Sequence, residues 1–276
     1  MPNCNIPVAG ITQFVTPVAN VTAHGSAMPQ RFAYQLYSSR NFGPVEQTLV
    51  MLKAAGYSAV EGFGGVYGAP AKLRAALDAN GLLMPSGHFG LDMLEDKPAE
   101  VMAIARTLGM TTLVMPWLSS ELRPADSAGW RSLASRLAAL TRRYRPEGFA
   151  VAYHNHDFEF VPTSDGAVPQ ALLFEAAPLL DWEIDVAWVV RGGEDAVKWI
   201  TDYRSIITIA HVKDIAPQGQ NADEDGWSDV GQGTVDWKAC RAALAQSRCM
   251  SFVMEHDNPK DDRRFATTSI AAARQL

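Results

Sequence analysis

The sequence lacks the long apolar run that a membrane-spanning helix needs. No stretch of its 276 residues reaches the roughly 18 consecutive apolar residues of such a helix. Residues 1–30 carry neither the basic start nor the continuous apolar core of a secretory signal. We therefore expect a protein without a membrane partner, in which residues 1–30 form an N-terminal extension and residues 31–276 a single domain.

The sequence has few cysteines and no excess of positive charge. Three cysteines (Cys4, Cys240 and Cys249) show no CxxC spacing, which argues against a disulfide framework and favours a reducing, cytoplasmic location. The 24 lysines and arginines are outnumbered by 30 aspartates and glutamates, which gives a net charge of -6. Because a nucleic-acid partner needs a positive field, we expect small-molecule ligands instead. The composition is compatible with a homo-oligomer.

Two glycine-rich signatures of nucleotide binding are missing. The first expected strand is followed by SSRNFG rather than by GxGxxG, and GFGGVYG at residues 62–68 lacks the GK[ST] ending of a P-loop. The first absence disfavours a doubly wound open sheet, which is the main alternative fold. The second makes GFGGVYG a loop after the second strand, with Phe63 as a candidate wall of a sugar-binding pocket.

Short β-rich runs alternate with segments of helical period along the rest of the chain, a pattern typical of βα units on a parallel sheet. The eight runs cover residues 32–37, 59–62, 83–88, 112–116, 149–155, 182–185, 206–212 and 252–255. The length of 276 residues is close to the roughly 250 of a closed barrel with eight such units. We therefore predict a (β/α)8 TIM barrel, whose catalytic groups stand at the carboxyl ends of the strands.

Helical periodicity and stop signals fill the gaps between these runs. One apolar stripe recurs at i, i+3, i+7 and i+10, in Trp130, Leu133, Leu137 and Leu140. Such a stripe predicts a helix packed against the sheet. Glycines stand where helices would end on a left-handed residue, at Gly56, Gly81 and Gly109.

Ionisable residues gather at the expected strand ends. They are Glu61, His88, His154, His156, Asp185, His211, Lys213, Glu255 and His256, and they include five of the six histidines. Residues two apart on a strand share a face, so His154 and His156 point the same way, as do His211 and Lys213. The carboxyl ends of parallel strands lie at one edge, so we expect these side chains to enter one cavity.

Imidazole nitrogens and carboxylate oxygens together suit Zn²⁺, Mn²⁺ or Co²⁺. Asp185, His211 and Glu255 close three successive strands, and no cysteine stands nearby, which favours an open catalytic metal site over a closed structural one. Each residue also has a structural reading. Asp185 could cap the next helix, His88 and His256 could be hydrogen-bonded wall residues, and Lys213 could be a solvated loop charge.

The motifs YHNHDFEF, EIDVAW, HVKD, DVGQGTVDW and VMEHDNP occur in this order. In this respect the chain resembles the sugar phosphate isomerase/epimerase family of the xylose isomerase-like barrels. The resemblance implies one divalent metal held by strand-end residues of strands five to eight. Asp185, His211 and Glu255 match three of these positions. On strand five, where many epimerases of this group carry a glutamate, this sequence has His154, which becomes the fourth candidate ligand.

The resemblance implies proton abstraction next to the carbonyl of a sugar, keto-sugar or polyol, through a metal-stabilised enediolate. Candidate bases are Glu255, His156 and His256, in that order. Lys213 is a candidate for catalysis or for binding the substrate, and Glu61 completes the catalytic set. Candidate substrate-binding residues are His88, Trp117, Trp188, Lys213 and Phe63.

Several alternatives remain open at this point. The YHxH run is also similar to that of inosose dehydratases, and His154 in place of a glutamate favours isomerisation or elimination over epimerisation. Elimination would make the chain a dehydratase or a 3-keto-glycoside lyase or hydratase. A sugar-binding barrel without turnover is an alternative of another class. An endonuclease IV-type nuclease is disfavoured, because three zinc ions need more ligands and a basic groove.

Overall fold

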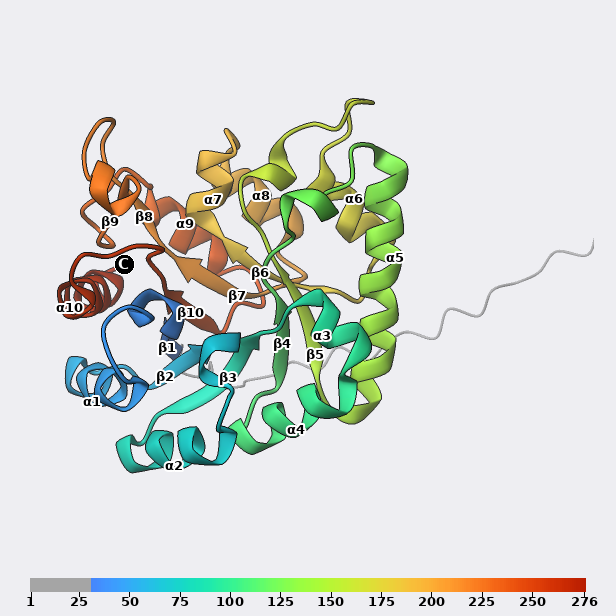
Figure 1. Ribbon diagram of the computed structural model, residues 1–276. Coiled ribbons are helices and arrows are strands. Elements are labelled where there is room, and N and C mark those ends of the chain that lie inside the picture. Colours follow the sequence, from blue (N-terminus) through green and yellow to red (C-terminus); the bar gives the residue numbers. More distant parts are fainter. Residues whose placement is uncertain (1–30) are drawn as a thin grey trace, which may run out of the picture.

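The computed structural model describes residues 31–276, so the extension predicted for residues 1–30 lies outside the described residues. Eight parallel strands close into a barrel in the order β1–β10–β7–β6–β5–β4–β3–β2 (Figure 1). They are β1 (Arg31–Gln35), β2 (Ala59–Gly62), β3 (Leu83–His88), β4 (Thr112–Met115), β5 (Ala150–His154), β6 (Asp181–Asp185), β7 (Ile207–Val212) and β10 (Ser251–Met254). Each strand begins and ends within two residues of its predicted bounds, which confirms the (β/α)8 barrel.

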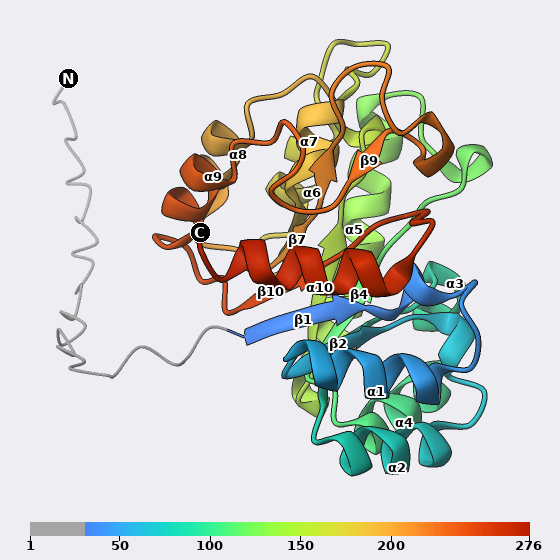
Figure 2. The ribbon, with the colours of Figure 1, turned by 90° about the vertical axis from the view of Figure 1, so that its left-hand side faces the viewer.

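The helices surround the barrel on its outside (Figures 1 and 2). They are α1 (Val45–Ala55), α2 (Pro70–Asn80), α3 (Leu91–Asp96), α4 (Pro98–Leu108), α5 (Ser127–Tyr144), α6 (Pro169–Ala176), α7 (Val186–Arg191), α8 (Ala196–Tyr203), α9 (Trp237–Leu244) and α10 (Asp262–Ala273). Among residues 31–276, no helix combines the length and the apolarity that crossing a membrane requires.

Local signals in the sequence explain where these helices pack and end. The predicted stripe of α5 is buried, and the same helix begins with the Asp126 side chain accepting from the backbone N–H of Gly129. Helices α1, α2 and α4 end at Gly56, Gly81 and Gly109, which have φ values of 95°, 59° and 80°. This left-handed conformation is the one predicted for the three glycines.

Short 3-10 helices lie in several of the connections. They are η1 (Leu36–Ser39), η2 (Gly64–Val66), η3 (Ser120–Leu122), η4 (Arg145–Glu147), η5 (Phe158–Phe160) and η6 (Ala222–Glu224). The first of them explains why β1 ends at Gln35 rather than at residue 37. The Gln35 side chain accepts from the backbone N–H of Tyr37 at 3.1 Å and turns the chain out of the strand.

The connection between β7 and α9 contains an antiparallel pair that was not predicted, β8 (Asp214–Ile215) and β9 (Trp227–Ser228). The Asp214 carboxylate accepts from the backbone N–H groups of Gly231, Gly233 and Val235 at 2.9–3.2 Å. These bonds fold the DVGQGTVDW segment back onto the pair. Helix α9 then begins at Trp237.

The inside of the barrel changes from apolar to polar toward the carboxyl ends of the strands. Its apolar floor is a small cluster of Ala33, Ala59, Ile209 and Val253. Since residues two apart share a face, the next inward position on each of these strands carries a polar side chain: Gln35, Glu61, His211 and Glu255, respectively. All four polar side chains are buried. The fold therefore places buried polar and charged side chains directly above this small apolar cluster.

Candidate metal centre and pocket

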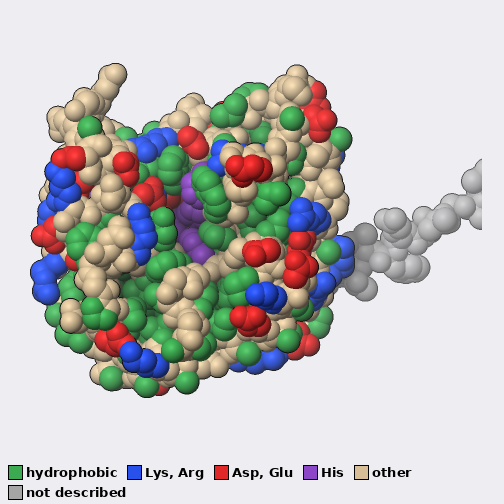
Figure 3. All heavy atoms as spheres, in the orientation of Figure 1, with side chains coloured by type: hydrophobic (Ala, Val, Ile, Leu, Met, Phe, Trp, Pro, Cys, Tyr) green, Lys and Arg blue, Asp and Glu red, His purple; other side chains and the backbone are tan. Residues whose placement is uncertain are grey.

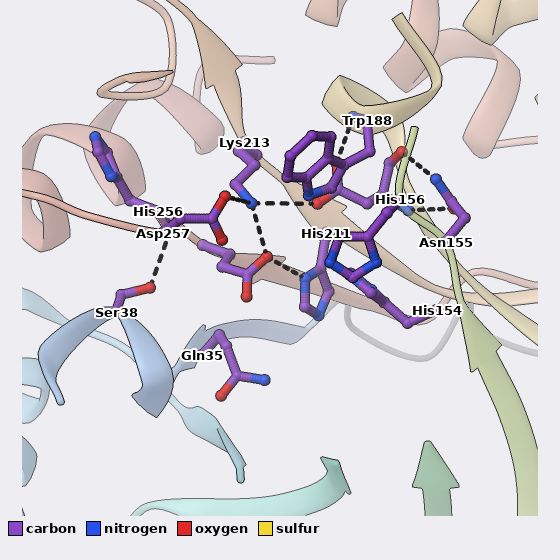
Figure 4. Close-up of polar contacts among 12 residues, drawn as sticks. Gln35, Ser38, His154, Asn155, His156, Trp188, His211, Lys213, His256 and Asp257 are labelled. Carbon is purple, nitrogen blue, oxygen red and sulfur yellow. Dashed lines mark hydrogen bonds and ion pairs between the residues drawn. The ribbon is translucent and has the colours of Figure 1, made fainter. Parts of the chain in front are cut away.

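Four of the predicted ligands come together at the carboxyl end of the barrel. One ligand atom from each of His154, Asp185, His211 and Glu255 lies within 4.8 Å of the others, and all four residues are buried. Strand register accounts for part of this, because Asp185 and His211 are direct partners on β6 and β7. We call these four residues the upper set; Figure 4 shows several of them beside Lys213 and Trp188.

Asp185 has both roles that its sequence position allows. Its Oδ1 accepts from the backbone N–H of Trp188 at 2.9 Å and caps α7. Its Oδ2 is buried without a hydrogen-bond partner, and so is Nδ1 of His154. Unpartnered buried polar atoms are costly. Two such atoms in one cluster of imidazoles and carboxylates fit a divalent transition metal.

Both ring nitrogens of His211 face carboxylates. Nδ1 lies 2.9 Å from Oε2 of Glu255, and Nε2 lies 2.7 Å from Oε1 of Glu61. Burial disfavours the charged imidazole, but the surrounding carboxylates of Glu183, Glu255 and Glu61 outweigh burial and raise the pKa of His211 well above its usual value. The ring is therefore held from both sides, with Nδ1 toward the upper set.

Glu61, a predicted catalytic residue, lies below the upper set and is fully buried. Gln35 donates to it at 2.9 Å, and the Ser86 hydroxyl donates to its other oxygen. These three residues are register partners on β1, β2 and β3. The structure thus places Glu61 as the carboxylate behind His211 rather than at the pocket wall, an arrangement that orients a metal-binding imidazole.

Asn155 holds the backbone of Asp185 from the neighbouring strand. Its Oδ1 accepts from the Asp185 N–H and from Trp182 Nε1, both at 2.9 Å, and its Nδ2 donates to the Asp185 carbonyl at 3.1 Å. Asn155 was not among the predicted site residues. Its position between the two histidines of HNH was the available signal.

Lys213 is fully buried among carboxylates. It donates to Asp257 at 2.8 Å and to Glu255 at 3.2 Å, and Asp185 Oδ2 lies 3.7 Å away. Burial disfavours the charged amine, but the carboxylates outweigh burial and raise the pKa of Lys213. Its ammonium also lies 4.4 Å from the centre of the Trp227 ring. The reading of Lys213 as a solvated loop charge is wrong.

A cavity of about 650 Å³ opens above these groups. Its described lining includes the predicted substrate-binding residues Phe63, His88, Trp117 and Trp188, together with His154, His156 and Glu255. Figure 3 shows histidine side chains at the bottom of this hollow, flanked by hydrophobic ones. The cavity therefore gives a small molecule access to the upper set.

The His156 ring packs among the aromatic side chains of this wall, 4.8 Å from Trp117 and 5.1 Å from Trp188 between ring centres. Its Nδ1 is buried without a partner. Burial, together with the charges of His154 and Lys213, lowers the pKa of His156 well below its usual value. His156 is therefore a neutral imidazole at the cavity wall.

The structure does not bring His256 into this group. Its ring points away from Lys213 (Figure 4) and packs edge-on against Phe265 at 5.2 Å. Its Nδ1 accepts from the backbone N–H of Asn258 at 3.1 Å. Adjacent residues on an extended chain point in opposite directions, so with Glu255 facing inward, His256 faces outward. This placement matches the wall-residue reading of His256.

Two residues that were not predicted, Glu183 and Asp257, lie beside the upper set. Glu183 stands two residues before Asp185, and Asp257 stands two residues after Glu255. The rule that pairs His154 with His156 would have found both. Asp257 lines the cavity and binds Lys213, whereas Glu183 is fully buried below the upper set.

Comparison with known proteins identifies the class to which this barrel and cluster belong. A family model described as xylose isomerase-like TIM barrel matches residues 49–275, so the chain belongs to that family. A search of the curated proteins found no match.

Solved structures share the fold over nearly their whole length. A sugar phosphate isomerase/epimerase from Parabacteroides distasonis ATCC 8503 is 19% identical with a TM-score of 0.75, covering 93% of this chain and 99% of its own. AsbF, a probable 3-DHS dehydratase from Bacillus anthracis, is 11% identical with a TM-score of 0.70 and coverages of 88% and 98%. The IolI protein, solved with a zinc atom, is 15% identical with a TM-score of 0.71 and coverages of 89% and 97%.

Proposed function

We propose that this chain is a divalent-metal-dependent enzyme that removes a proton next to the carbonyl of a keto-sugar or related polyol, leading to isomerisation or epimerisation. The observation that carries the proposal is the upper set, four ligand-type side chains within 4.8 Å of one another below a cavity of about 650 Å³. A cavity of this size accommodates a small organic molecule.

The proposed metal ligands are His154, Asp185, His211 and Glu255. A mixed set of imidazoles and carboxylates suits Zn²⁺, Mn²⁺ or Co²⁺. A bound ion of this kind supplies Lewis-acid polarisation of substrate oxygens. The zinc atom in the related IolI structure supports the choice of a transition metal.

Glu255 and His156 are the proposed proton-transfer groups. Glu255 lines the cavity, and although burial disfavours its charged form, Lys213 and His211 lower its pKa well below the usual value. It is therefore present as the carboxylate, the form that a base needs, although the lowered pKa makes it a weaker base than a free carboxylate. The neutral His156 ring, unpartnered at Nδ1, can accept or return a proton at the other wall. Lys213 holds Glu255 and Asp257 in place and supplies fixed positive charge nearby.

The residues that line the cavity favour an uncharged substrate over a phosphorylated one. Phe63, Trp117 and Trp188 offer apolar faces on which a sugar ring can pack. Of the described residues that line the cavity, one is an arginine, Arg123, and its Nε already donates to the Leu118 carbonyl. Carboxylates of the same wall would repel a phosphate group. We therefore propose that the substrate is an unphosphorylated sugar or polyol.

Elimination is the second candidate reaction. The observation that favours it is the imidazole of His154 at a position where a carboxylate would allow symmetric proton exchange on both faces of a sugar. The relative AsbF, described as a probable dehydratase, has the same fold. Loss of a leaving group next to the carbanion would then replace reprotonation.

Solvent-deuterium exchange into a panel of keto-sugars and keto-polyols, followed by NMR, tests the proposal. Deuterium next to the carbonyl without loss of a substituent indicates isomerisation or epimerisation, and an unsaturated product indicates elimination. Saturable binding of panel members without exchange or product would leave a sugar-binding barrel and would falsify the proposed chemistry.

Glu255→Gln and His156→Gln probe the two proton-transfer groups. We expect each variant to lower kcat by about 10²–10⁴-fold, the usual contribution of a positioned acid or base. His156→Gln should keep the metal content of the unmodified protein, because His156 is outside the upper set. Elemental analysis and circular dichroism check metal and fold, and an unchanged kcat in both variants rejects the assignment.

A further inference from the structure

A second group of ligand-type side chains lies deeper in the barrel. Nε2 of His88, Nε2 of His211 and Nδ1 of His154 lie 2.7, 3.1 and 3.3 Å from Oε1 of Glu183. We call these four residues the deep set. One ligand atom from each lies within 4.8 Å of the others, and all four residues are buried. His88 and Glu183 belong to this set alone.

Hydrogen bonds within the protein do not satisfy the deep set. Oε2 of Glu183 is buried without a hydrogen-bond partner, and Nδ1 of His154, although 3.3 Å from Oε1 of Glu183, makes no hydrogen bond. Nε2 of His88 lies near Oε1 of both Glu183 (2.7 Å) and Glu61 (3.2 Å), although one ring nitrogen carries at most one proton. Three ring nitrogens thus converge on one oxygen of the Glu183 carboxylate, while its other oxygen has no hydrogen-bond partner. A cation among them would give each atom a partner.

The chemistry and spacing of the deep set suit a transition metal. Three imidazoles and a carboxylate are a common ligand set for Zn²⁺ and Co²⁺. Tetrahedral bonds of about 2.0–2.1 Å place ligand atoms about 3.3 Å apart, which is near the observed contacts of 2.7–3.3 Å. Glu183 and the neighbouring Glu61 carry the two negative charges that balance a divalent ion.

An ion can reach the deep set from the cavity, because His88 lines the cavity wall. The two sets share His154 and His211. The His211 ring presents Nδ1 to Glu255 of the upper set and Nε2 to Glu183 of the deep set. Binding one ion through each nitrogen would require the ring to release both of its N–H protons.

From these contacts we infer that the deep set is a second transition-metal site, which shares His154 and His211 with the upper set and can be filled without the upper carboxylates Asp185 and Glu255. The deep set would hold its ion beneath the cavity, deeper in the barrel than the upper set. The inference does not depend on the proposed catalytic reaction. The unmodified protein is then expected to bind two divalent ions per chain.

Co²⁺ titration, followed by visible absorption and calorimetry, tests this inference. The double variant Asp185→Asn/Glu255→Gln removes both carboxylates of the upper set and should still bind one equivalent of Co²⁺. Adding His88→Gln should weaken that binding at least 100-fold. Adding His256→Gln instead is the matched control, because this buried histidine faces away from both sets, and it should leave the binding unchanged.

Two results would overturn the inference: a folded double variant that binds no Co²⁺, or a triple variant with His88→Gln that binds it as tightly as its parent. Near-ultraviolet circular dichroism establishes folding. If the multiple variants do not fold, the single variant His88→Gln decides, because it should reduce the stoichiometry from two ions to one. One ion in both the unmodified protein and this variant would show that the deep set is only a hydrogen-bonded support.

Discussion

At the scale of single residues, the side chain of Asn155 decides where the Asp185 carboxylate stands. It makes three buried hydrogen bonds across β5 and β6, two of them to the backbone of Asp185. One carboxylate oxygen of Asp185 caps α7, and the other has no hydrogen-bond partner and can bind a metal ion. A residue that touches neither substrate nor metal thereby fixes a proposed ligand.

Asn155→Ala is expected to weaken metal binding about 10–100-fold, the usual effect of losing a group that orients a ligand. It should also lower the free energy of unfolding by about 2–4 kcal/mol, because it leaves buried donors and acceptors unpaired. Calorimetric metal titration and urea denaturation measure the two effects.

Asn80→Ala is the matched control, since Asn80 donates one bond to the Ala76 carbonyl at the end of α2 and belongs to neither ligand set. It should leave metal affinity unchanged. Equal metal affinity in Asn155→Ala and the unmodified protein would contradict the positioning role.

At the scale of elements, the segment from β8 to α9 is built around one carboxylate. Asp214 accepts four backbone N–H groups, from Ile215, Gly231, Gly233 and Val235. A Cβ on Gly233 would lie 2.2 Å from Oδ1 of Asp214 and 2.5 Å from the Ile215 carbonyl oxygen. The segment therefore depends on the absence of a side chain at this position.

Gly233→Ala should lower the free energy of unfolding by about 1–3 kcal/mol, the usual cost of forcing an extra carbon into a packed site. It should also speed hydrogen exchange at the amides bound to Asp214. Gly68→Ala serves as the control, because a Cβ at Gly68 meets no atom within 4 Å. Equal unfolding free energies for the two variants would show that the segment adjusts without strain.

The sequence predicted the barrel elements well and the inside of the barrel poorly, for a physical reason. Parallel strands are buried on both faces, so a strand such as DWEID does not show by alternation which face is interior. Glu183 was missed for this reason, although its spacing from Asp185 carried the signal. The β8–β9 pair was missed because strands of two residues have no periodicity to detect.

Among the site residues, the sequence could name the proposed ligands, which the structure brings together, but not their surroundings. Asp185, His211 and Glu255 follow from strand ends alone, because the carboxyl ends of barrel strands converge. The burial of Lys213 and the position of Glu61 behind His211 depend on side-chain packing between strands far apart in the sequence. Such contacts cannot be derived from local spacing.

At the scale of the whole molecule, the barrel has buried charges where many barrels have packed aliphatic side chains. His88, Glu61, Glu183 and His211 are buried and contact one another. A bound ion would therefore contribute to the stability of the fold as well as to chemistry.

Removal of bound metal with a chelator is expected to lower Tm, and Zn²⁺, Mn²⁺ or Co²⁺ should restore it. At a free ion concentration of 100 times Kd, one site adds about 2.7 kcal/mol, which corresponds to a shift of roughly 5–10 °C for a chain of this size. Ca²⁺ is the control, because imidazole ligands suit transition metals rather than Ca²⁺. Melts insensitive to all three transition metals would contradict the metal proposal.

The β8–β9 pair contacts the site through the ring of Trp227, which lies against Lys213 and Trp188. Its Trp227 packs edge-on against the cavity residue Trp188 at 4.8 Å, while Asp214 anchors the segment through backbone groups. No residue of the upper or the deep set comes from this segment. A change in this segment would therefore alter the cavity wall through the position of Trp188, without replacing a residue of either ligand set.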